Sequence, residues 1–484
     1  MFLGIDLGTS SLKLVLVAAD GRVVASATAP LTVSRPAPGH CEQDPEAWWQ
    51  AFCVTLDALR AARAAALAAV RAIGLSGQMH GAVLLDAAGR VLRPCMLWND
   101  VRASAECAEL EHRFPALQAV TGNRAMPGFT APKLLWVRRH EPDIFARVAN
   151  VLLPKAWLRY RLSGEKFDDM SDASGTLWLD VARRDWSDRA LAATFLSRDA
   201  MPRLVEGNAP AGQLRAGLAA RWGMRSPVVI AGGAGDNAAG AVGLGAIHPG
   251  DAFISLGTSG VVWATTSRFV PYPQAAVHAF CHALPGLWHQ MGVTLSAAAC
   301  LAWWSRVTGR REAALLRELP PLLAPSPVLF LPYLSGERTP HNDGAVRGVF
   351  AELAHETSRA MLTQAVLEGV AFSLRDCLDS LAASGTRIEA ADVIGGGSRS
   401  RVWVAILAAV LGIKLHRVAE AAYGAAYGAA RLARLAATGE APDAVCGRPR
   451  RLATVTAEPA LVAAYAQQLA RYRALYPAIS GVAA

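Results

Sequence analysis

Two short stretches of this sequence decide its fold: GIDLGTSSLK at residues 4–13 and DAFISLGTSG at residues 251–260. In each stretch an apolar, strand-like run ends in a Gly-Thr-Ser turn, and a second apolar run follows. Thr9 and Thr258 lie half a chain apart. This self-similarity predicts that the chain is built from a duplicated unit.

Strands alternate with helices around both copies, so we expect an α/β protein of two domains. The Gly, His and Pro residues of Gly243–Pro249 mark the boundary, which gives domains at residues 1–246 and 247–484. A chain of 484 residues is also too long for one ordinary core. A ligand would bind in the cleft between the two domains.

Composition narrows the class of protein. Residues are 53% hydrophobic and 18% charged, which excludes disorder as the main state. The net charge of +9 comes from scattered Arg doublets, whereas a nucleic-acid binder concentrates its positive charge. No two of the eight Cys are close enough for a CxxC metal or redox motif. Because Asp6 and Lys13 interrupt the apolar start, we expect no leader and no membrane partner, and a cytoplasmic location.

The remaining elements can be expected from local patterns. Asp44 and Pro45 predict the start of a helix that runs to Val70. Residues 82–86 and 90–92 read as a hairpin, and Thr357–Ala383 reads as a long amphipathic helix. Near the end of the chain, Ala421–Ala437 predicts a helix of small residues that could pack closely on a neighbour.

The two Gly-Thr-Ser turns are candidate phosphate loops. Glycine allows close approach of the backbone, and the amides and hydroxyls are donors to phosphate oxygens. Either turn alone is more simply an ordinary hairpin turn, but two copies on facing walls would suit a polyphosphate. Asp6 precedes the first loop, where the second has Ser255. The carboxylate of Asp6 is suited to hydrated Mg²⁺ beside phosphates.

Asp236 is a second candidate carboxylate. It follows an apolar strand and the glycine turn at residues 232–235, and it opens a helix of small residues. The simpler interpretation is a helix N-cap, a position that Asp favours. The alternative is a general base exposed in the cleft, because a sugar hydroxyl needs one to attack phosphorus at neutral pH.

Three further groups could line the same cleft. His80, beside Met79, follows a strand in a polar loop, although a lone His is usually a core or surface residue. Trp98 and Asp100 belong to a compact polar cluster, but they could equally be a core residue and one half of a surface ion pair. The Gly395–Ser398 turn before a helix is a weak nucleotide signal by itself. A Walker A loop and an early GxGxxG motif are both missing, which disfavours the P-loop and Rossmann folds.

In their order along the chain, these segments resemble the FGGY carbohydrate kinases, within the actin/Hsp70/sugar-kinase group. The stretches at 4–13, 233–243, 251–260 and 395–403 are similar to the family's phosphate, catalytic-aspartate and adenosine motifs, and FLPYLSGERTPHNDGAVRG at 330–348 to its long signature. The resemblance covers almost the whole chain. It implies a two-domain actin-like ATPase (ribonuclease H-like) fold with a central catalytic cleft.

The loops SGQMHG at 76–81, LWNDVR at 97–102 and SDASGT at 171–176 are similar to the branch that phosphorylates D-xylulose at O5. The resemblance implies ATP and Mg²⁺ as cofactors, with Asp236 as the base and Asp6 near the metal. The implied sugar contacts are Met79, His80, Trp98, Asp100 and Asn237. The implied nucleotide contacts are Gly8, Thr9, Ser10, Lys13, Gly257, Thr258, Ser259, Gly396, Gly397 and Ser398.

Alternatives stay open at this point. The substrate could be another pentulose, a pentitol or a related polyol, since such kinases share much of the pattern. A non-metabolic actin-like ATPase would also hold ATP between two domains, but would need no sugar pocket. A sugar sensor without turnover is a third possibility, disfavoured by the presence of Asp6 and Asp236. The partners implied are a sugar and MgATP, and a homodimer is expected only by analogy.

Overall fold

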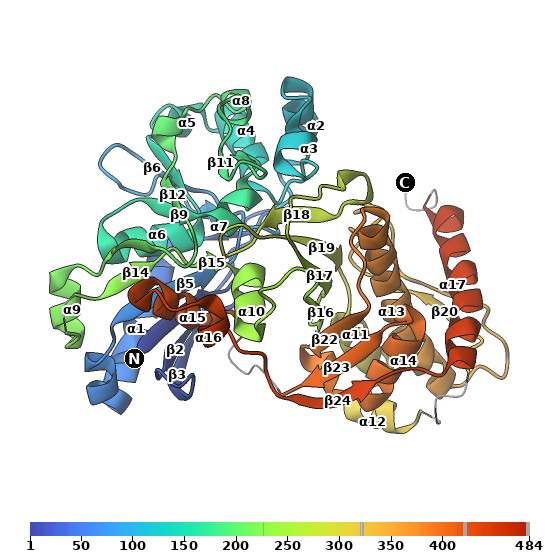
Figure 1. Ribbon diagram of the computed structural model, residues 1–484. Helices are drawn as coiled ribbons and strands as arrows, with labels where there is room; N and C mark the ends of the chain where they lie inside the picture. The colour runs from blue at the N-terminus through green and yellow to red at the C-terminus, as the bar shows by residue number, and fades with distance from the viewer. Residues whose placement is uncertain (226, 320, 322–323, 420–423, 481–484) are drawn as a thin grey trace.

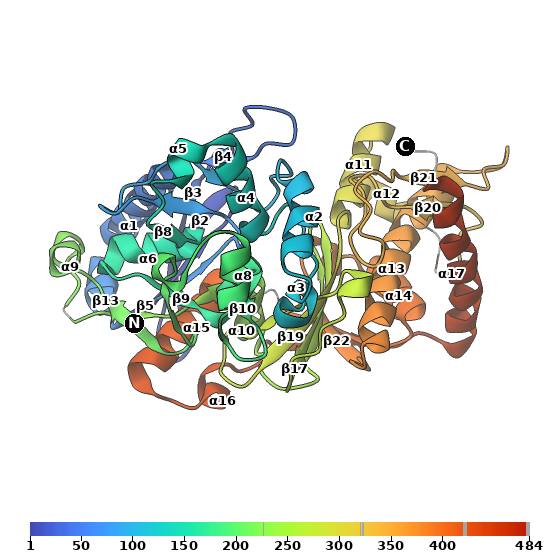
Figure 2. The same ribbon diagram turned by 90° about the horizontal axis from the view of Figure 1, so that it is seen from above.

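The computed structural model describes residues 1–225, 227–319, 321, 324–419 and 424–480. Two mixed sheets of seven strands lie side by side, each flanked by helices (Figures 1 and 2). Strands of the first half of the chain form one sheet, and strands of the second half form the other. The structure therefore confirms the expected α/β organisation.

The first sheet has the order β13-β14-β5-β1-β2-β3, and β15 also pairs with β5. Its strands are β1 (Phe2–Leu7), β2 (Ser11–Val17), β3 (Val23–Pro30), β5 (Ala72–Gly77), β13 (Pro210–Gln213), β14 (Val229–Ala231) and β15 (Ala234–Gly235). β1 runs antiparallel to β2 and parallel to β5.

The second sheet has the order β18-β19-β17-β16-β22-β23-β24. Its strands are β16 (Ala252–Leu256), β17 (Gly260–Thr266), β18 (His278–Cys281), β19 (Trp288–Thr294), β22 (Ala390–Ile394), β23 (Lys414–Val418) and β24 (Arg451–Val455). β16 runs antiparallel to β17 and parallel to β22.

Strand order and direction repeat between the two sheets. The path β3-β2-β1-β5-β14-β13 corresponds to β19-β17-β16-β22-β23-β24, with the same succession of antiparallel and parallel pairs. β1 and β16 therefore occupy equivalent central places, and each ends at a Gly-Thr-Ser loop. This is the arrangement that a duplicated unit predicts.

Helices and short strands complete the two bodies. The helices of the first half are α1 (Pro45–Ala68), α2 (Ser104–Arg113), α3 (Leu117–Thr121), α4 (Thr130–His140), α5 (Pro142–Phe145), α6 (Pro154–Ser163), α7 (Met170–Ala173), α8 (Asp188–Ala193), α9 (Ala216–Trp222) and α10 (Asp236–Leu244). Those of the second half are α11 (Ala298–Thr308), α12 (Glu312–Arg317), α13 (Arg359–Ala383), α14 (Arg401–Leu411), α15 (Gly424–Thr438), α16 (Pro442–Val445) and α17 (Pro459–Ile479). The short strands are β4 (Glu42–Gln43), β6 (Val83–Leu85), β7 (Cys95–Met96), β8 (Asn150–Leu152), β9 (Phe167–Asp169), β10 (Leu179–Asp180), β11 (Asp185–Trp186), β12 (Arg203–Val205), β20 (Leu329–Leu331) and β21 (Val349–Ala351).

Most of the local expectations agree with these bounds. Asp44 caps α1 by accepting a hydrogen bond from the Glu46 amide, and Pro45 is its first residue. The expected hairpin at 82–92 is present: Leu85 and Val91 form an antiparallel bridge, and the Leu92 amide donates to the Leu84 carbonyl at 2.9 Å. β6 also pairs with the distant β8. Of the small-residue helix expected at 421–437, residues 421–423 lie outside the described residues.

α15 belongs to the second half in sequence but packs against the first sheet and α10 (Figure 1). A Cβ atom added to Gly4 of β1 would lie 1.8 Å from the Ala426 carbonyl oxygen. A Cβ atom on Gly428 would lie 1.7 Å from the Ala239 carbonyl oxygen. Glycine is required at both positions because the backbones themselves touch. The boundary at residue 246 stays a prediction.

None of the described helices combines the length and the apolar character that crossing a membrane requires.

Because α15 packs tightly on α10, adding one methyl group at Gly428 should strongly reduce stability. Gly428→Ala forces the two helices apart, so we expect it to lower the free energy of unfolding by about 2 kcal/mol or more. The matched control is Gly217→Ala in α9, where an added Cβ atom meets no neighbour within 4 Å. It should be neutral or slightly stabilising. Thermal unfolding of both variants measures the difference, and equal melting temperatures would refute the close contact.

Candidate active site

Strand pairing places the two candidate carboxylates on either side of β5. Asp6 of β1 is in register with Ser76 of β5, and Ala234 of β15 is in register with the same residue from the other side. Asp236 follows β15 directly and begins α10. Since neighbouring strands lie about 4.8 Å apart, the backbones at Asp6 and Ala234 are separated by about 10 Å. Both carboxylates therefore lie at the carboxyl ends of the two strands that flank β5 in the first sheet.

The environment of Asp236 raises the pKa of its carboxyl group to about 6. Burial is the main cause, and the nearby negative charge of Asp6 adds to it. Burial also raises the pKa of Asp6. A carboxylate with a pKa near 6 is still ionised at neutral pH, yet it is a much stronger base than an exposed Asp.

Asn237 orients the Asp236 carboxylate. Its backbone amide and its side-chain amide both donate to Oδ1 of Asp236, at 2.7 and 2.9 Å. Both of these hydrogen bonds go to the same oxygen, and neither involves Oδ2. The N-cap position of α10 is Gly235, and no side chain caps this helix, so the capping interpretation of Asp236 does not hold.

A network of amides and hydroxyls fixes the first Gly-Thr-Ser loop. Thr9 Oγ1 donates to Gln78 Oε1 at 3.1 Å and accepts from Trp98 Nε1 at 2.9 Å. Gln43 Nε2 donates to the Thr9 carbonyl at 2.8 Å, and Gln78 Nε2 donates to Gln43 Oε1 at 3.0 Å. The Thr9 proton is committed within the protein, and Ser10 remains exposed at the tip of the loop. Lys13 of β2 lies in register with Asp6, close to the same loop.

His80, three residues beyond the end of β5, is held in one tautomer. Its Nδ1 lies 2.7 Å from the Gly175 carbonyl oxygen, which can only accept, so Nδ1 carries the proton. Burial lowers the pKa of His80 to about 3, so the ring is neutral and Nε2 is a hydrogen-bond acceptor. Phe129 contacts this ring edge-on at a centroid distance of 4.6 Å, and Phe280 of the second half lies 6.2 Å away.

Met79 lies between His80 and the start of α10. A Cβ atom on Gly235 would be 2.8 Å from the Met79 sulfur, and one on Gly175 would be 2.9 Å from its terminal methyl group. The thioether therefore fills the space that side chains at these two glycines would need. Met79 and His80 are thus brought close to the segment that carries Asp236.

Asp100 is fully buried and has a structural set of partners. Its carboxylate accepts from the Cys41 amide at 2.7 Å and forms a close ion pair with Arg102. Trp98, by contrast, is 40% exposed and contacts the first phosphate loop. The structure thus joins Trp98 to the candidate site through Thr9, while the polar atoms of Asp100 are engaged inside the protein.

The second Gly-Thr-Ser loop borders a large groove of about 660 Å³. The groove is lined by Thr258, by the first residues of α11, and by Gly396 and Gly397 of the turn that follows β22. The Gly257 and Thr258 carbonyls accept hydrogen bonds from Ala298 and Ala297 at the start of α11, which fixes the loop against that helix. The expected phosphate loop and the expected adenosine turn therefore share one groove.

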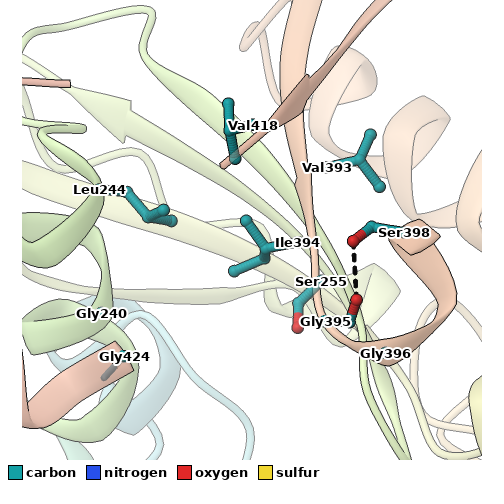
Figure 3. A pocket seen from close by; sticks show the side chains of 10 residues that line it. All are labelled: Gly240, Leu244, Ser255, Val393, Ile394, Gly395, Gly396, Ser398, Val418 and Gly424. Atoms are coloured by element: carbon teal, nitrogen blue, oxygen red, sulfur yellow. Dashed lines mark hydrogen bonds between the residues drawn. The ribbon is translucent and has the colours of Figure 1, made fainter. Parts of the chain in front are cut away.

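A smaller cavity of about 320 Å³ is lined by Gly395, Gly396 and Ser398 of the same turn (Figure 3). Leu244 of α10, Ile394 of β22 and Val418 of β23 line it, and Figure 3 shows these side chains around one space. Ser398 closes the turn by donating to the Gly395 carbonyl at 2.7 Å. This cavity joins the helix that begins at Asp236 to the glycine turn of the second sheet.

Asp6 offers one carboxylate oxygen that could bind a divalent cation. Asp6 Oδ1 is buried and has no hydrogen-bond partner among the described residues. A buried carboxylate oxygen without a partner is costly, and a hydrated Mg²⁺ ion would satisfy it.

The comparisons with known proteins agree with this geometry. The family model for the FGGY carbohydrate kinase N-terminal domain matches residues 1–243, and the C-terminal model matches residues 252–437. The chain belongs to the FGGY family of carbohydrate kinases and has its actin-like ATPase fold. It is therefore a sugar kinase, a phosphotransferase that uses ATP.

Individual relatives are similar over nearly the whole chain. A xylulose kinase from Escherichia coli (strain K12) is 52% identical, with 91% of each chain covered. A crystal structure from Brucella ovis, described as a xyloylose kinase, superposes with a TM-score of 0.97 at 54% identity and covers 99% of each chain. A xylulose kinase structure from Rhodospirillum rubrum gives 0.91 at 29% identity, again with 99% of each chain covered.

Several residues that build the site could not be identified as such from the sequence. Gln43 and Gln78 lock the first loop, and Phe129 and Phe280 contact His80. Gln78 lies in the polar loop at 76–81, two residues before His80, and this position could have identified it as a candidate site residue. Gln43 and the two Phe residues give no such local signal, since their roles depend on long-range packing.

The pKa of Asp236 predicts the pH dependence of turnover. A base must be ionised, so we expect kcat/KM for the sugar to fall about tenfold per pH unit below about pH 6. In metal-free protein, Asp6→Asn removes the neighbouring negative charge, so we expect NMR titration to give a lower pKa for the Asp236 carboxyl group than in wild type. The control is Asp20→Asn, at an exposed turn. The same Asp236 pKa in wild type and Asp6→Asn would contradict the coupling.

Proposed function

We propose that this protein transfers the γ-phosphoryl group of ATP to O5 of D-xylulose, giving D-xylulose 5-phosphate and ADP. The observation that carries the proposal is the Asp236 carboxylate, which has a pKa near 6 and begins α10 beside Asp6 and the two phosphate loops. The sugar is taken from the relatives, because two of them named xylulose kinase or xyloylose kinase exceed 50% identity over nearly the whole chain.

Asp236 acts as the general base in this reaction. Its Oδ2 accepts the proton of the attacking sugar hydroxyl as the sugar oxygen forms a bond to the γ-phosphorus. The bond from that phosphorus to the ADP oxygen breaks, and ADP leaves with the electron pair. Asn237 keeps Oδ1 occupied, so a single oxygen presents itself to the hydroxyl. Positioning and charge stabilisation account for most of the catalysis of phosphoryl transfer.

The nucleotide extends over the two loops. The amides of Gly8–Ser10 and Gly257–Ser259 contact the phosphates, together with the charge of Lys13. Adenosine occupies the 660 Å³ groove, because that groove is bordered both by Thr258 and by Gly396 and Gly397. Ser398, at the end of the turn, lines the smaller cavity instead. Asp6 holds Mg²⁺, which when bound neutralises phosphate charge.

The sugar lies against Met79, His80 and Asn237. His80 Nε2 can only accept a hydrogen bond, so it pairs with a sugar hydroxyl that donates. Trp98 approaches from the first phosphate loop, and Asp100 supports this wall through Arg102. The cytoplasmic location and the homodimer expected from the family remain predictions.

The test is ADP release from MgATP with a panel of acceptors: D-xylulose, L-ribulose, D-ribulose, glycerol, D-gluconate and xylitol. We expect kcat/KM for D-xylulose to exceed that for each of the others by at least about tenfold, since the net contribution of one hydrogen bond, about 1.4 kcal/mol, corresponds to that ratio. A preference for another acceptor would keep the reaction and change the substrate. ATP hydrolysis without regard to sugar would favour the actin-like ATPase instead.

A further inference from the structure

A cluster of charged residues is buried beside the catalytic segment and takes no part in the mechanism above. Asp168, Asp169 and Asp172 are each at most 1% exposed, and their oxygens lie close enough together to hold a metal ion. The ammonium group of Lys155 already occupies that place, at 2.9, 2.8 and 3.3 Å from the three carboxylates. Lys155 therefore supplies a positive charge at the centre of the three carboxylates.

This charged cluster is connected to the start of α10 by one hydroxyl group. Asp169 Oδ2 accepts from the amide and the hydroxyl of Ser171, so the Ser171 side chain is fixed. With its proton given to Asp169, Ser171 Oγ turns a lone pair to the Gly235 amide and accepts from it at 3.1 Å. Gly235 is the residue before Asp236. The chain of contacts thus runs from Lys155 through Asp169 and Ser171 to the base.

We propose that Ser171 and Asp169 are positioning residues for Asp236. The inference rests on the proposed function of Asp236 as the base. Gly235 pairs with β5 along the strand but carries no side chain that could anchor it further. The Ser171 hydroxyl restrains it from the side, and the charged cluster keeps that hydroxyl in one rotamer. Both Ser171 and Asp169 are fully buried, so their hydrogen bond is shielded from bulk solvent.

The stretch that carries Ser171 also contacts His80, through the backbone carbonyl of Gly175. The acceptor of His80 Nδ1 is the Gly175 carbonyl oxygen, which no side-chain substitution at Ser171 removes. Loss of the Ser171 hydroxyl therefore frees the base while it leaves the sugar contact in place. Loss of the Ser171 hydroxyl should therefore lower kcat and leave the KM for the sugar unchanged.

The experiment compares Ser171→Ala with Ser171→Cys and wild type, with the acceptor that wild type prefers. We expect Ser171→Ala to lower kcat about 10- to 100-fold with KM for sugar and ATP within about twofold, because small displacements of a catalytic group have such effects. Sulfur is a weak acceptor of similar size, so Ser171→Cys should give an intermediate kcat. The matched control is Ser380→Ala, a buried serine whose hydroxyl bonds only within α13.

The outcomes separate the two claims. If Ser171→Ala and Ser380→Ala have the same kcat, the positioning role is wrong while the proposed function stands. If KM for the sugar rises as much as kcat falls, Ser171 is only a structural residue of the pocket. If Ser171→Ala does not fold, Ser171→Cys with wild-type kcat overturns the proposal. Wild type without any sugar-dependent turnover refutes the proposed function itself, and the positioning role with it.

Discussion

The site depends on two carboxylates that the fold keeps buried at the carboxyl ends of the two strands that flank β5 in the first sheet. Asp6 and Asp236 are both buried, and the negative charge of Asp6 adds to the rise in the pKa of Asp236. Water would weaken this coupling, and an exposed Asp would be too weak a base for a sugar hydroxyl. Burial thus gives Asp236 its basicity, and it also leaves Asp6 Oδ1 without a hydrogen-bond partner among the described residues.

Close backbone packing keeps these carboxylates next to the second half of the chain. α10 begins at Asp236, and α15 crosses it where Gly428 meets Ala239. α15 also contacts β1, the strand that carries Asp6, through Gly4. The helix from the second half is therefore part of the support for both carboxylates. Because glycines mediate these contacts, the two halves approach more closely than side chains would allow.

The sequence was informative where function is local. The two Gly-Thr-Ser loops, the glycine turn before Asp236 and the cap of α1 are each encoded within a few residues, and the structure has the predicted elements at these places. The family resemblance followed from the same segments. Roles that depend on distant partners were not accessible: the pairing of β6 with β8, the contact of α15 with the first sheet, and the bond from Ser171 to Gly235. Asp100 illustrates the limit. Its partner Arg102 is only two residues away in the sequence, but the burial of Asp100 depends on distant parts of the chain.

Whether Asp236 removes the proton of the sugar hydroxyl is best tested with Asp236→Asn. The substitution keeps the shape of the side chain and removes its basicity. Rapid-quench measurement of sugar phosphate formed in a single turnover, with the nucleotide affinity measured in parallel, separates chemistry from binding. If Asp236 is the base, the rate should be about 10²- to 10⁴-fold lower, with ATP bound as tightly as in wild type. A rate within about threefold of wild type in the folded variant would contradict this role.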